Sequence, residues 1–237
     1  MSTLPTLIEN YLEYCKYQKR LDSKTLKAYR IDLRQFSEQL CSTDVADITQ
    51  FTLETYITTL HQKYKPKTVK RKIASLKAFF HYLEYREIIS NNPFYKIQLK
   101  FREPIILPKT IPLHTIEILL STIYKQFANA KTDYQRKNAL RDAAIIEFLF
   151  STGIRISELC ALKMNDINLY DCTVLIYGKG SKERKLQIAN DDVMQTLMKY
   201  QNSFLTEIQY CNHFFVNQNA TPVSDQSVRR MINKYTS

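Results

Sequence analysis

Glycine is confined to one short window of this chain. Only three of the 237 residues are glycine, at positions 153, 178 and 180. Glycine adopts backbone conformations that other residues avoid, so a chain that uses it so sparingly reveals where its backbone needs them. The first glycine lies in STGIRISEL, residues 151–159, two residues before Arg155. The window from 151 to 184 is therefore the first place to look for a site.

Each part of this window delivers one cationic side chain. Residues 136–153 are predicted to form an apolar helix that Gly153 ends, and Ser157 and Glu158 begin the next helix, so Arg155 occupies the turn between two buried helices. Beyond residue 171 the pattern becomes that of two strands around GKGSK, residues 178–182, which predicts a hairpin whose glycines supply positive φ. Lys179 is expected at the tip of that hairpin.

These two cations suit phosphate chemistry. A rigidly held guanidinium can bind two oxygens of one phosphate, and a lysine on a mobile tip can protonate a leaving oxygen. Considered separately, each also has a purely structural interpretation: Arg155 as a salt-bridge partner of Glu158 at a helix end, and Lys179 as an ordinary turn lysine. Nucleotide-binding glycine motifs fail on spacing, because Thr173 and Glu183 stand where glycines are required.

The first hundred residues carry helical periodicity almost throughout. Apolar residues recur at spacings of three and four, which is typical of amphipathic helices packed against one another. Ser23 and Thr52 are the predicted N-caps of the second and third helices. The four expected helices span residues 4–17, 23–40, 52–63 and 66–85.

Positive charge is concentrated in the same region. The chain has a formal net charge of +11, and residues 1–103 hold 18 Lys and Arg against 11 Asp and Glu. Helix N-termini attract anions, and lysines and hydroxyls beside them strengthen that attraction. The starts of the second and fourth expected helices are therefore the predicted nucleic-acid contacts: Lys24, Thr25, Lys27, Lys67, Thr68, Lys70, Arg71 and Lys77.

The chain is expected to form two domains. Residues 91–112 hold four of the seven prolines with little periodicity and predict a linker, with domains at 1–103 and 104–237. The second domain is predicted to hold helices at 113–127, 136–153, 157–167, 191–204 and 224–235, the hairpin, and a short strand within 213–221. The expected fold is mainly α with a small antiparallel β-hairpin or sheet.

Several classes of protein are excluded by what the sequence lacks. It has no apolar run long enough for a membrane span and no signal-peptide pattern, so a cytoplasmic protein with no membrane partner is expected. Five cysteines without C-x-x-C pairs predict reduced thiols, with neither zinc nor disulfides. We expect no metal and no cofactor.

Together the motifs resemble a known family. TGIRISELCALKMNDI, followed by the lysine of GKGSKERKLQI, closely resembles the tyrosine recombinases of the phage integrase and Xer group. SKTLKAYRIDLRQF and TVKRKIASLKAFFHYL are similar to that family's helical, SAM-like core-binding domain, and NNPFYKI with LPKTIP to its interdomain link. The remaining residues resemble the first part of its mixed α+β catalytic domain.

The resemblance implies site-specific DNA recombination without a metal. In that family a tyrosine attacks a phosphodiester to give a 3′-phosphotyrosine, and a second strand's hydroxyl reverses the step. By that likeness Arg155 would bind the scissile phosphate, Glu158 would orient Arg155, and Lys179 would be the general acid. Lys182 and Arg184 would contact phosphates. The implied partners are a duplex recombination site and other recombinase protomers.

The family pattern is incomplete in these residues. It continues with a His-x-x-Arg motif and a nucleophilic tyrosine, and none of the four histidines here has arginine three residues later. Tyr235 lies in VRRMINKY, which resembles the helix before that motif, so no nucleophile is expected in this chain. Three interpretations stay open: a C-terminally truncated recombinase, a DNA-binding module that does not cut, and a helical adaptor for RNA or acidic protein.

Overall fold

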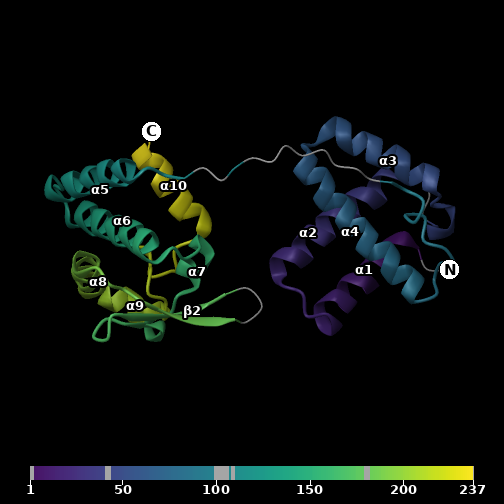
Figure 1. Cartoon of the computed structure of the whole chain (residues 1–237). Helices are drawn as coiled ribbons and strands as arrows, with labels where there is room; N and C mark the ends of the chain where they lie inside the picture. The colour runs from purple at the N-terminus through teal and green to yellow at the C-terminus, as the bar shows by residue number, and fades with distance from the viewer. Residues whose placement is uncertain (1–2, 41–43, 99–106, 108–109, 179–181, 237) are drawn as a thin grey trace. The chain divides into compact units, whose positions relative to one another are not determined.

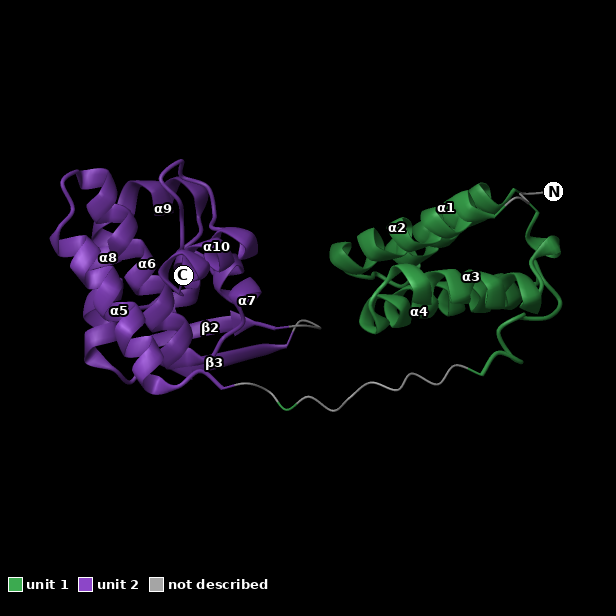
Figure 2. Ribbon diagram, turned by 90° about the horizontal axis from the view of Figure 1, so that it is seen from above, with its two compact units in different colours: residues 1–107 green, residues 108–237 purple. Residues whose placement is uncertain are grey.

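The computed structural model divides the chain into two compact units, residues 1–107 and 108–237 (Figure 2). The structure describes residues 3–40, 44–98, 107, 110–178 and 182–236. Within these residues no helix is long and apolar enough to cross a bilayer. Each unit has its own hydrophobic core.

The elements of unit 1 in its described residues are all helical (Figure 1). Its elements are α1 Leu4–Glu13, the π-helical turn η1 Tyr14–Gln18, α2 Ser23–Gln39, the 3-10 turn η2 Val45–Asp47, α3 Gln50–Lys63 and α4 Pro66–Tyr85. Its core follows the predicted periodicity of three and four. The buried apolar residues include Leu4, Leu7, Ile8, Tyr11 and Leu12 of α1, and Val69, Ile73, Leu76, Phe80 and Leu83 of α4. Aromatic rings pack between the helices: the Tyr11 ring centroid lies 5.4 Å from that of Phe79 and 5.1 Å from that of Tyr82.

Both predicted N-caps in unit 1 are wrong. The cap of α2 is Asp22, whose carboxylate accepts the Thr25 amide at 2.9 Å, and Ser23 is already helical. The cap of α3 is Thr49, whose hydroxyl accepts the Thr52 amide at 3.3 Å. In each case another capping residue lies one to three positions upstream and satisfies the free N–H groups of the first turn.

The first part of the expected linker belongs to unit 1. Phe94 and Ile97 are buried in its core, and the buried Asn92 accepts the Phe94 amide at 3.0 Å. The Phe94 ring also packs edge-on against Phe80 of α4, with centroids 5.5 Å apart. Packing in unit 1 therefore extends to Ile97, and α5 of unit 2 begins at Leu113.

Unit 2 consists of helices packed against one face of a small sheet. Its elements are α5 Leu113–Ala128, α6 Asp133–Thr152, α7 Ile156–Ala161, the 3-10 turn η3 Met164–Asp166, β1 Ile167–Asn168, β2 Thr173–Tyr177, β3 Glu183–Gln187, α8 Asp191–Ser203, α9 Leu205–Cys211 and α10 Asp225–Thr236. The sheet is antiparallel in the order β1-β2-β3. The buried helix α6 lies between α5 and α8 (Figure 1). The described elements are thus mainly α with the predicted antiparallel hairpin.

The strand predicted within 213–221 is wrong. The structure gives this stretch only isolated bridges, Lys163 with His213 and Val216 with Pro222. The Phe214 amide donates to the Leu162 carbonyl at 2.8 Å and the Val216 amide to the buried Tyr200 hydroxyl at 2.9 Å. Because these backbone groups bond to separate partners, no continuous ladder forms.

Among the described cysteines, Cys15 is buried and Cys160, Cys172 and Cys211 are half-buried, and Cys41 lies outside the described residues. Within the described part of the chain no cluster of three His, Cys, Asp or Glu side chains could hold a metal ion.

Candidate active site

The turn that carries Arg155 is built as the first glycine predicts. Gly153 ends α6 in the left-handed conformation at φ 64°, and its amide donates to the Leu149 carbonyl at 3.0 Å. A side chain would have space there, so the backbone angle is what requires glycine. The chain then reverses and Arg155 becomes the N-cap of α7.

Glu158 holds Arg155 in two ways. Its Oε2 accepts the Arg155 backbone amide at 2.9 Å, and its Oε1 accepts the Arg155 Nη1 at 3.0 Å. The Glu158 side chain is 6% exposed, whereas that of Arg155 is 73% exposed. A buried carboxylate therefore anchors a guanidinium that still faces solvent, which is the geometry needed to present an arginine to an anion.

A second arginine shares the same carboxylate, and the sequence did not predict it in this role. Arg184 on β3 donates from Nη1 to Glu158 Oε1 at 3.2 Å and from Nη2 to Oε2 at 2.7 Å. Its strand partner is the buried Ile176, so both side chains point to the inner face of the sheet. Strand alternation offered the signal, because Arg184, Leu186 and Ile188 share one face. Its phosphate contact stays a prediction.

The two arginines keep Glu158 ionised. The Arg184 hydrogen bonds lower the pKa of Glu158 most; burial opposes them, and the Arg155 amide and guanidinium add to the lowering, which brings the pKa to about 2. The cluster therefore holds one negative and two positive groups at neutral pH, with the surplus positive charge on the more exposed side.

The second glycine serves a different purpose from the predicted one. Gly178 does not have positive φ; its amide donates to the Lys182 carbonyl at 2.7 Å. A Cβ there would lie 3.3 Å from that carbonyl oxygen and 3.4 Å from Arg184 Nη1. Glycine thus lets the hairpin backbone approach the Glu158–Arg184 pair closely. Lys182 is exposed, and the predicted general acid Lys179 lies outside the described residues.

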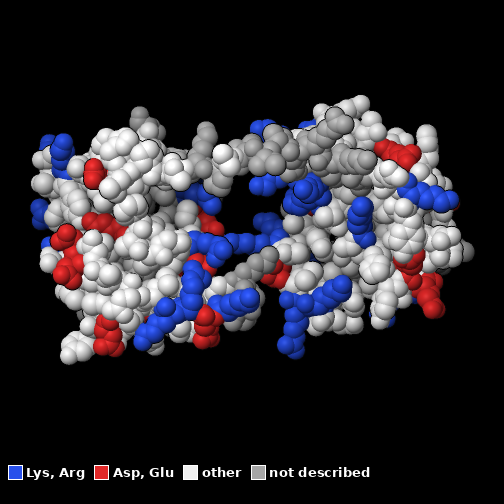
Figure 3. All heavy atoms as spheres, in the orientation of Figure 1, with Lys and Arg blue, Asp and Glu red and all other residues white. Residues whose placement is uncertain are grey.

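The predicted nucleic-acid contacts of unit 1 gather at two helix ends. α2 and α4 begin at the same side of the unit (Figure 1), where Lys and Arg side chains cluster on the surface (Figure 3). Lys24, Lys27, Lys67 and Lys70 are exposed there, and Thr25 and Thr68 are half-buried. The Thr25 hydroxyl donates to Asp22 at 2.7 Å. Lys77, farther along α4, is exposed, with its ammonium 6.0 Å from the Phe94 ring centroid.

A buried carboxylate also lies beneath this basic surface. Asp32 of α2 accepts hydrogen bonds from Arg71, Lys72 and Ser75 of α4. Only Arg71 of these four was a predicted site residue. The partners lie about forty positions away in sequence, so neither periodicity nor motif spacing points to them.

Tyr235 is held as a structural residue. Its hydroxyl donates to Asp142 Oδ2 at 3.0 Å, and Asp142 is buried and paired with Arg141. Burial, followed by the nearby carboxylate, raises the pKa of Tyr235 far above its usual range. The Tyr235 hydroxyl therefore serves as a hydrogen-bond donor to a buried carboxylate.

Two family patterns match the chain. The pattern described as "Phage integrase family" matches residues 119–237, and "Phage integrase, N-terminal SAM-like domain" matches residues 8–87. The chain is 64% identical over 237 residues to a protein named tyrosine recombinase from Agathobacter rectalis, covering all of this chain and 78% of that one. It is 30% identical to tyrosine recombinase XerD of Listeria monocytogenes, covering 95% of this chain and 75% of that one. The chain belongs to the phage integrase family of tyrosine recombinases.

Solved structures show the same fold. A lambda integrase tetramer bound to a Holliday junction matches with a TM-score of 0.71 at 18% identity, over 99% of this chain and 66% of that one. The XerH site-specific recombinase bound to difH substrate matches with a TM-score of 0.68 at 19% identity, over 97% of this chain and 68% of that one. The mainly helical, two-unit architecture is thus that of tyrosine recombinases.

Proposed function

We propose that this chain acts in site-specific DNA recombination and that its partners are a duplex recombination site and further recombinase protomers. The observation that carries the proposal is the exposed Arg155 guanidinium anchored on the buried Glu158 carboxylate. Such an arginine binds a phosphodiester and stabilises the charge that develops on its oxygens during transfer. Family membership supplies the reaction: exchange of a phosphodiester for a 3′-phosphotyrosine, followed by attack of a second strand's hydroxyl.

Each predicted residue then has one role. Arg155 binds the scissile phosphate, and Glu158 orients the Arg155 guanidinium. Lys179 donates a proton to the leaving 5′-oxygen, and Lys182 contacts the backbone nearby. In unit 1, the exposed lysines at the starts of α2 and α4 bind backbone phosphates of the recombination site. Arg184 supports Glu158 from the hairpin and, like Lys182, contacts a phosphate.

The second candidate is DNA binding without cleavage by residues 1–237 alone. The bond from Tyr235 to Asp142 favours it, because the tyrosine nearest the end of α10 is engaged as a structural donor. Family chemistry needs a second arginine and a histidine on the same phosphate besides the nucleophile. Such groups act as a unit, so losing several of them removes nearly all of the rate enhancement.

The test is covalent capture on nicked duplex DNA. We expect residues 1–237 to bind the duplex and to form no phosphotyrosine adduct, with or without Mg²⁺. Adding the rest of the catalytic domain of an intact relative should restore the adduct if the two parts associate, and Arg155→Ala should remove it again. Lys199→Ala, an exposed change on α8, is the matched control and should leave the restored adduct intact.

Two results would contradict this proposal. An adduct formed by residues 1–237 alone and lost in Tyr235→Phe would make Tyr235 the nucleophile. Restored adduct that is insensitive to Arg155→Ala would remove Arg155 from the phosphate site.

A further inference from the structure

The inference concerns the carboxylate buried between α2 and α4. The Asp32 side chain is fully buried, and its two oxygens divide their partners. Oδ1 accepts from the Lys72 ammonium at 3.1 Å, while Oδ2 accepts from the Ser75 hydroxyl at 2.9 Å and from Arg71 Nη1. Every donor comes from the first half of α4, so one α2 side chain fixes the start of that helix.

Lys72 and Arg71 differ in whether they keep hydrogen-bond donors available to a partner outside the protein. The Lys72 side chain is 3% exposed, and its ammonium also donates to Gln35 and lies 5.0 Å from the Tyr64 ring centroid. Lys72 therefore neutralises Asp32 inside the unit. The Arg71 side chain is 45% exposed. A guanidinium has five N–H donors, so the single bond to Asp32 leaves others for an outside acceptor.

We propose that Asp32 is a positioning residue for DNA binding: it fixes the Arg71 guanidinium at the basic surface so that the remaining donors meet a backbone phosphate. The proposal rests on the DNA-binding function proposed above and adds a residue that touches no DNA. Holding a long cationic side chain in place before binding lowers the entropy lost when the complex forms. Lys and Arg side chains gather on the surface of unit 1 beside the starts of α2 and α4 (Figure 3).

The proposal predicts that DNA affinity changes in the direction opposite to the one that net charge alone predicts. Asp32→Asn keeps the shape of the side chain and removes one negative charge from beneath the DNA-binding surface. On charge alone, affinity for a polyanion would rise. If positioning dominates, affinity falls, because Arg71 is released. The two effects can therefore be told apart by direction.

A matched control lies on the same helix. Glu38 pairs with Arg34 at 2.7 Å, and both side chains are largely exposed. Glu38→Gln removes the same charge from α2 without touching Arg71. With a mixed-sequence duplex of about 30 base pairs, we expect Asp32→Asn to weaken binding roughly three- to tenfold, the range that immobilising one flexible side chain costs. Glu38→Gln should bind as tightly as the unmodified chain or more tightly.

Coupling to Arg71 separates positioning from damage to the fold. We expect Arg71→Ala to weaken binding, and Asp32→Asn added to it to cause no further loss. If Asp32→Asn does not fold, judged by circular dichroism, Arg71→Lys carries the test. It keeps the charge but not the planar fork, and should lose as much affinity as Arg71→Ala.

Affinity unchanged or raised in Asp32→Asn would overturn the proposal, as would a full further loss in the Arg71→Ala background. Arg71→Lys that binds like the unmodified chain would also overturn it. Failure of the proposed function looks different, because then the unmodified chain itself does not bind the duplex.

Discussion

Glu158 is the residue through which both arginines of the candidate active site are held. Arg155 reaches it from the start of α7, and Arg184 reaches it from β3. One carboxylate therefore joins the start of α7, which presents Arg155, to the hairpin that carries Lys179. Removing it would leave Arg184, which is only 38% exposed, without its acceptor on the inner face of the sheet.

The ion cluster predicts how stability depends on pH. The pKa of Glu158 falls from 4.5 to about 2 on folding, so its ionised form stabilises the folded state above pH 4.5 and this contribution is lost as pH falls toward 2. We expect Glu158→Gln to lower the unfolding free energy by on the order of 2 kcal/mol at pH 7. The difference between the two proteins should shrink between pH 4.5 and 2, measured by urea unfolding with circular dichroism.

The control for this prediction is another carboxylate of unit 2. Glu207 pairs with Lys137 at 3.2 Å, in a more exposed setting. Glu207→Gln should lower the unfolding free energy at pH 7 by less than Glu158→Gln does, because a more exposed ion pair gains less from its Coulomb attraction. A deficit in Glu158→Gln that stays constant down to pH 2 would show that charge on Glu158 is not what stabilises the cluster.

At this scale the sequence predicted contacts that are local and missed those that are not. The pairing of Arg155 with Glu158 follows from three-residue spacing at a helix start. The contact from Arg184 depends on how a hairpin folds back onto a helix 26 positions earlier, and the one from Asp32 to Lys72 spans 40 positions. Spacing rules describe neighbours within one element, so contacts between elements lay beyond them.

Helices α2 and α4 show how whole elements create the basic surface. Both begin at the same side of unit 1, so the positive ends of two helix dipoles and their flanking lysines converge (Figure 1). The presence of the helices in unit 1 was predictable from apolar periodicity. The starts of α2 and α3 were not, because Asp22 and Thr49 cap them in place of the predicted residues. The two-residue strand β1 and the seven-residue helix α9 are too short to leave a periodic signal.

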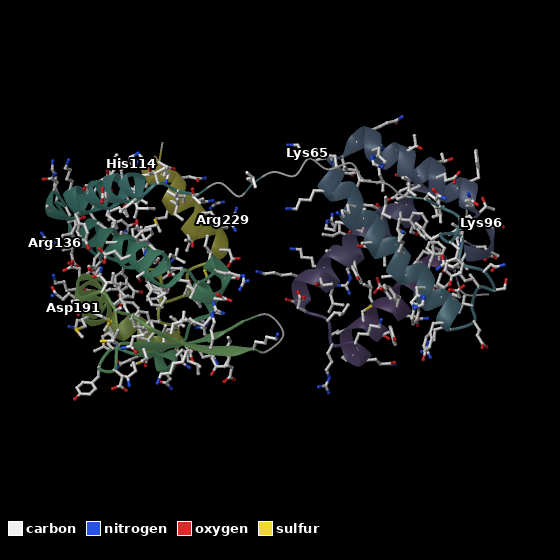
Figure 4. The ribbon with its side chains drawn as sticks, in the orientation of Figure 1. Lys65, Lys96, His114, Arg136, Asp191 and Arg229 are labelled. Carbon is white, nitrogen blue, oxygen red and sulfur yellow. The ribbon has the colours of Figure 1, made fainter. Side chains whose placement is uncertain are left out.

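The start of α4 can be tested as an element. Replacing Lys67, Lys70 and Arg71 with alanine should weaken duplex binding and flatten its salt dependence, by up to about 0.9 in the log–log slope for each lost phosphate contact. Fluorescence anisotropy across a salt series measures this slope. Lys96→Ala is the control, since Lys65 before α4 and Lys96 lie on opposite sides of unit 1 (Figure 4).

The reduction in the salt-dependence slope per charge removed should therefore be larger for the triple variant than for Lys96→Ala. Lys67→Ala alone should reduce the slope more than Lys96→Ala. Equal reductions would mean that only total charge matters and that the ends of α2 and α4 are not the DNA surface.

At the scale of the whole molecule, the chain forms two hydrophobic cores that share no residue. Among the described residues, the last buried member of the unit 1 core is Ile97, and the first buried apolar residue of unit 2 is Ile116 on α5. Proline content had pointed to this region, but it could not show that Phe94 and Ile97 pack into unit 1, because that depends on the shape of the gap between the helices. Two independent cores mean that each unit can be examined by itself.

Limited proteolysis tests this division. We expect trypsin to cut first at Lys100, Arg102 or Lys109, the basic residues of the predicted proline-rich linker between Ile97 and α5, because linkers are the preferred sites of proteolysis. The resulting N-terminal fragment should keep its helical circular dichroism, since its core is complete through Ile97, and should retain part of the duplex affinity through α2 and α4. Mass spectrometry of the first products identifies the cut, and Lys199 on α8 serves as an internal comparison, because a folded helix resists cleavage. First cleavage within residues 20–80 would mean that the helices of unit 1 open more readily than the segment joining the units, and the assignment of two independent cores would fail.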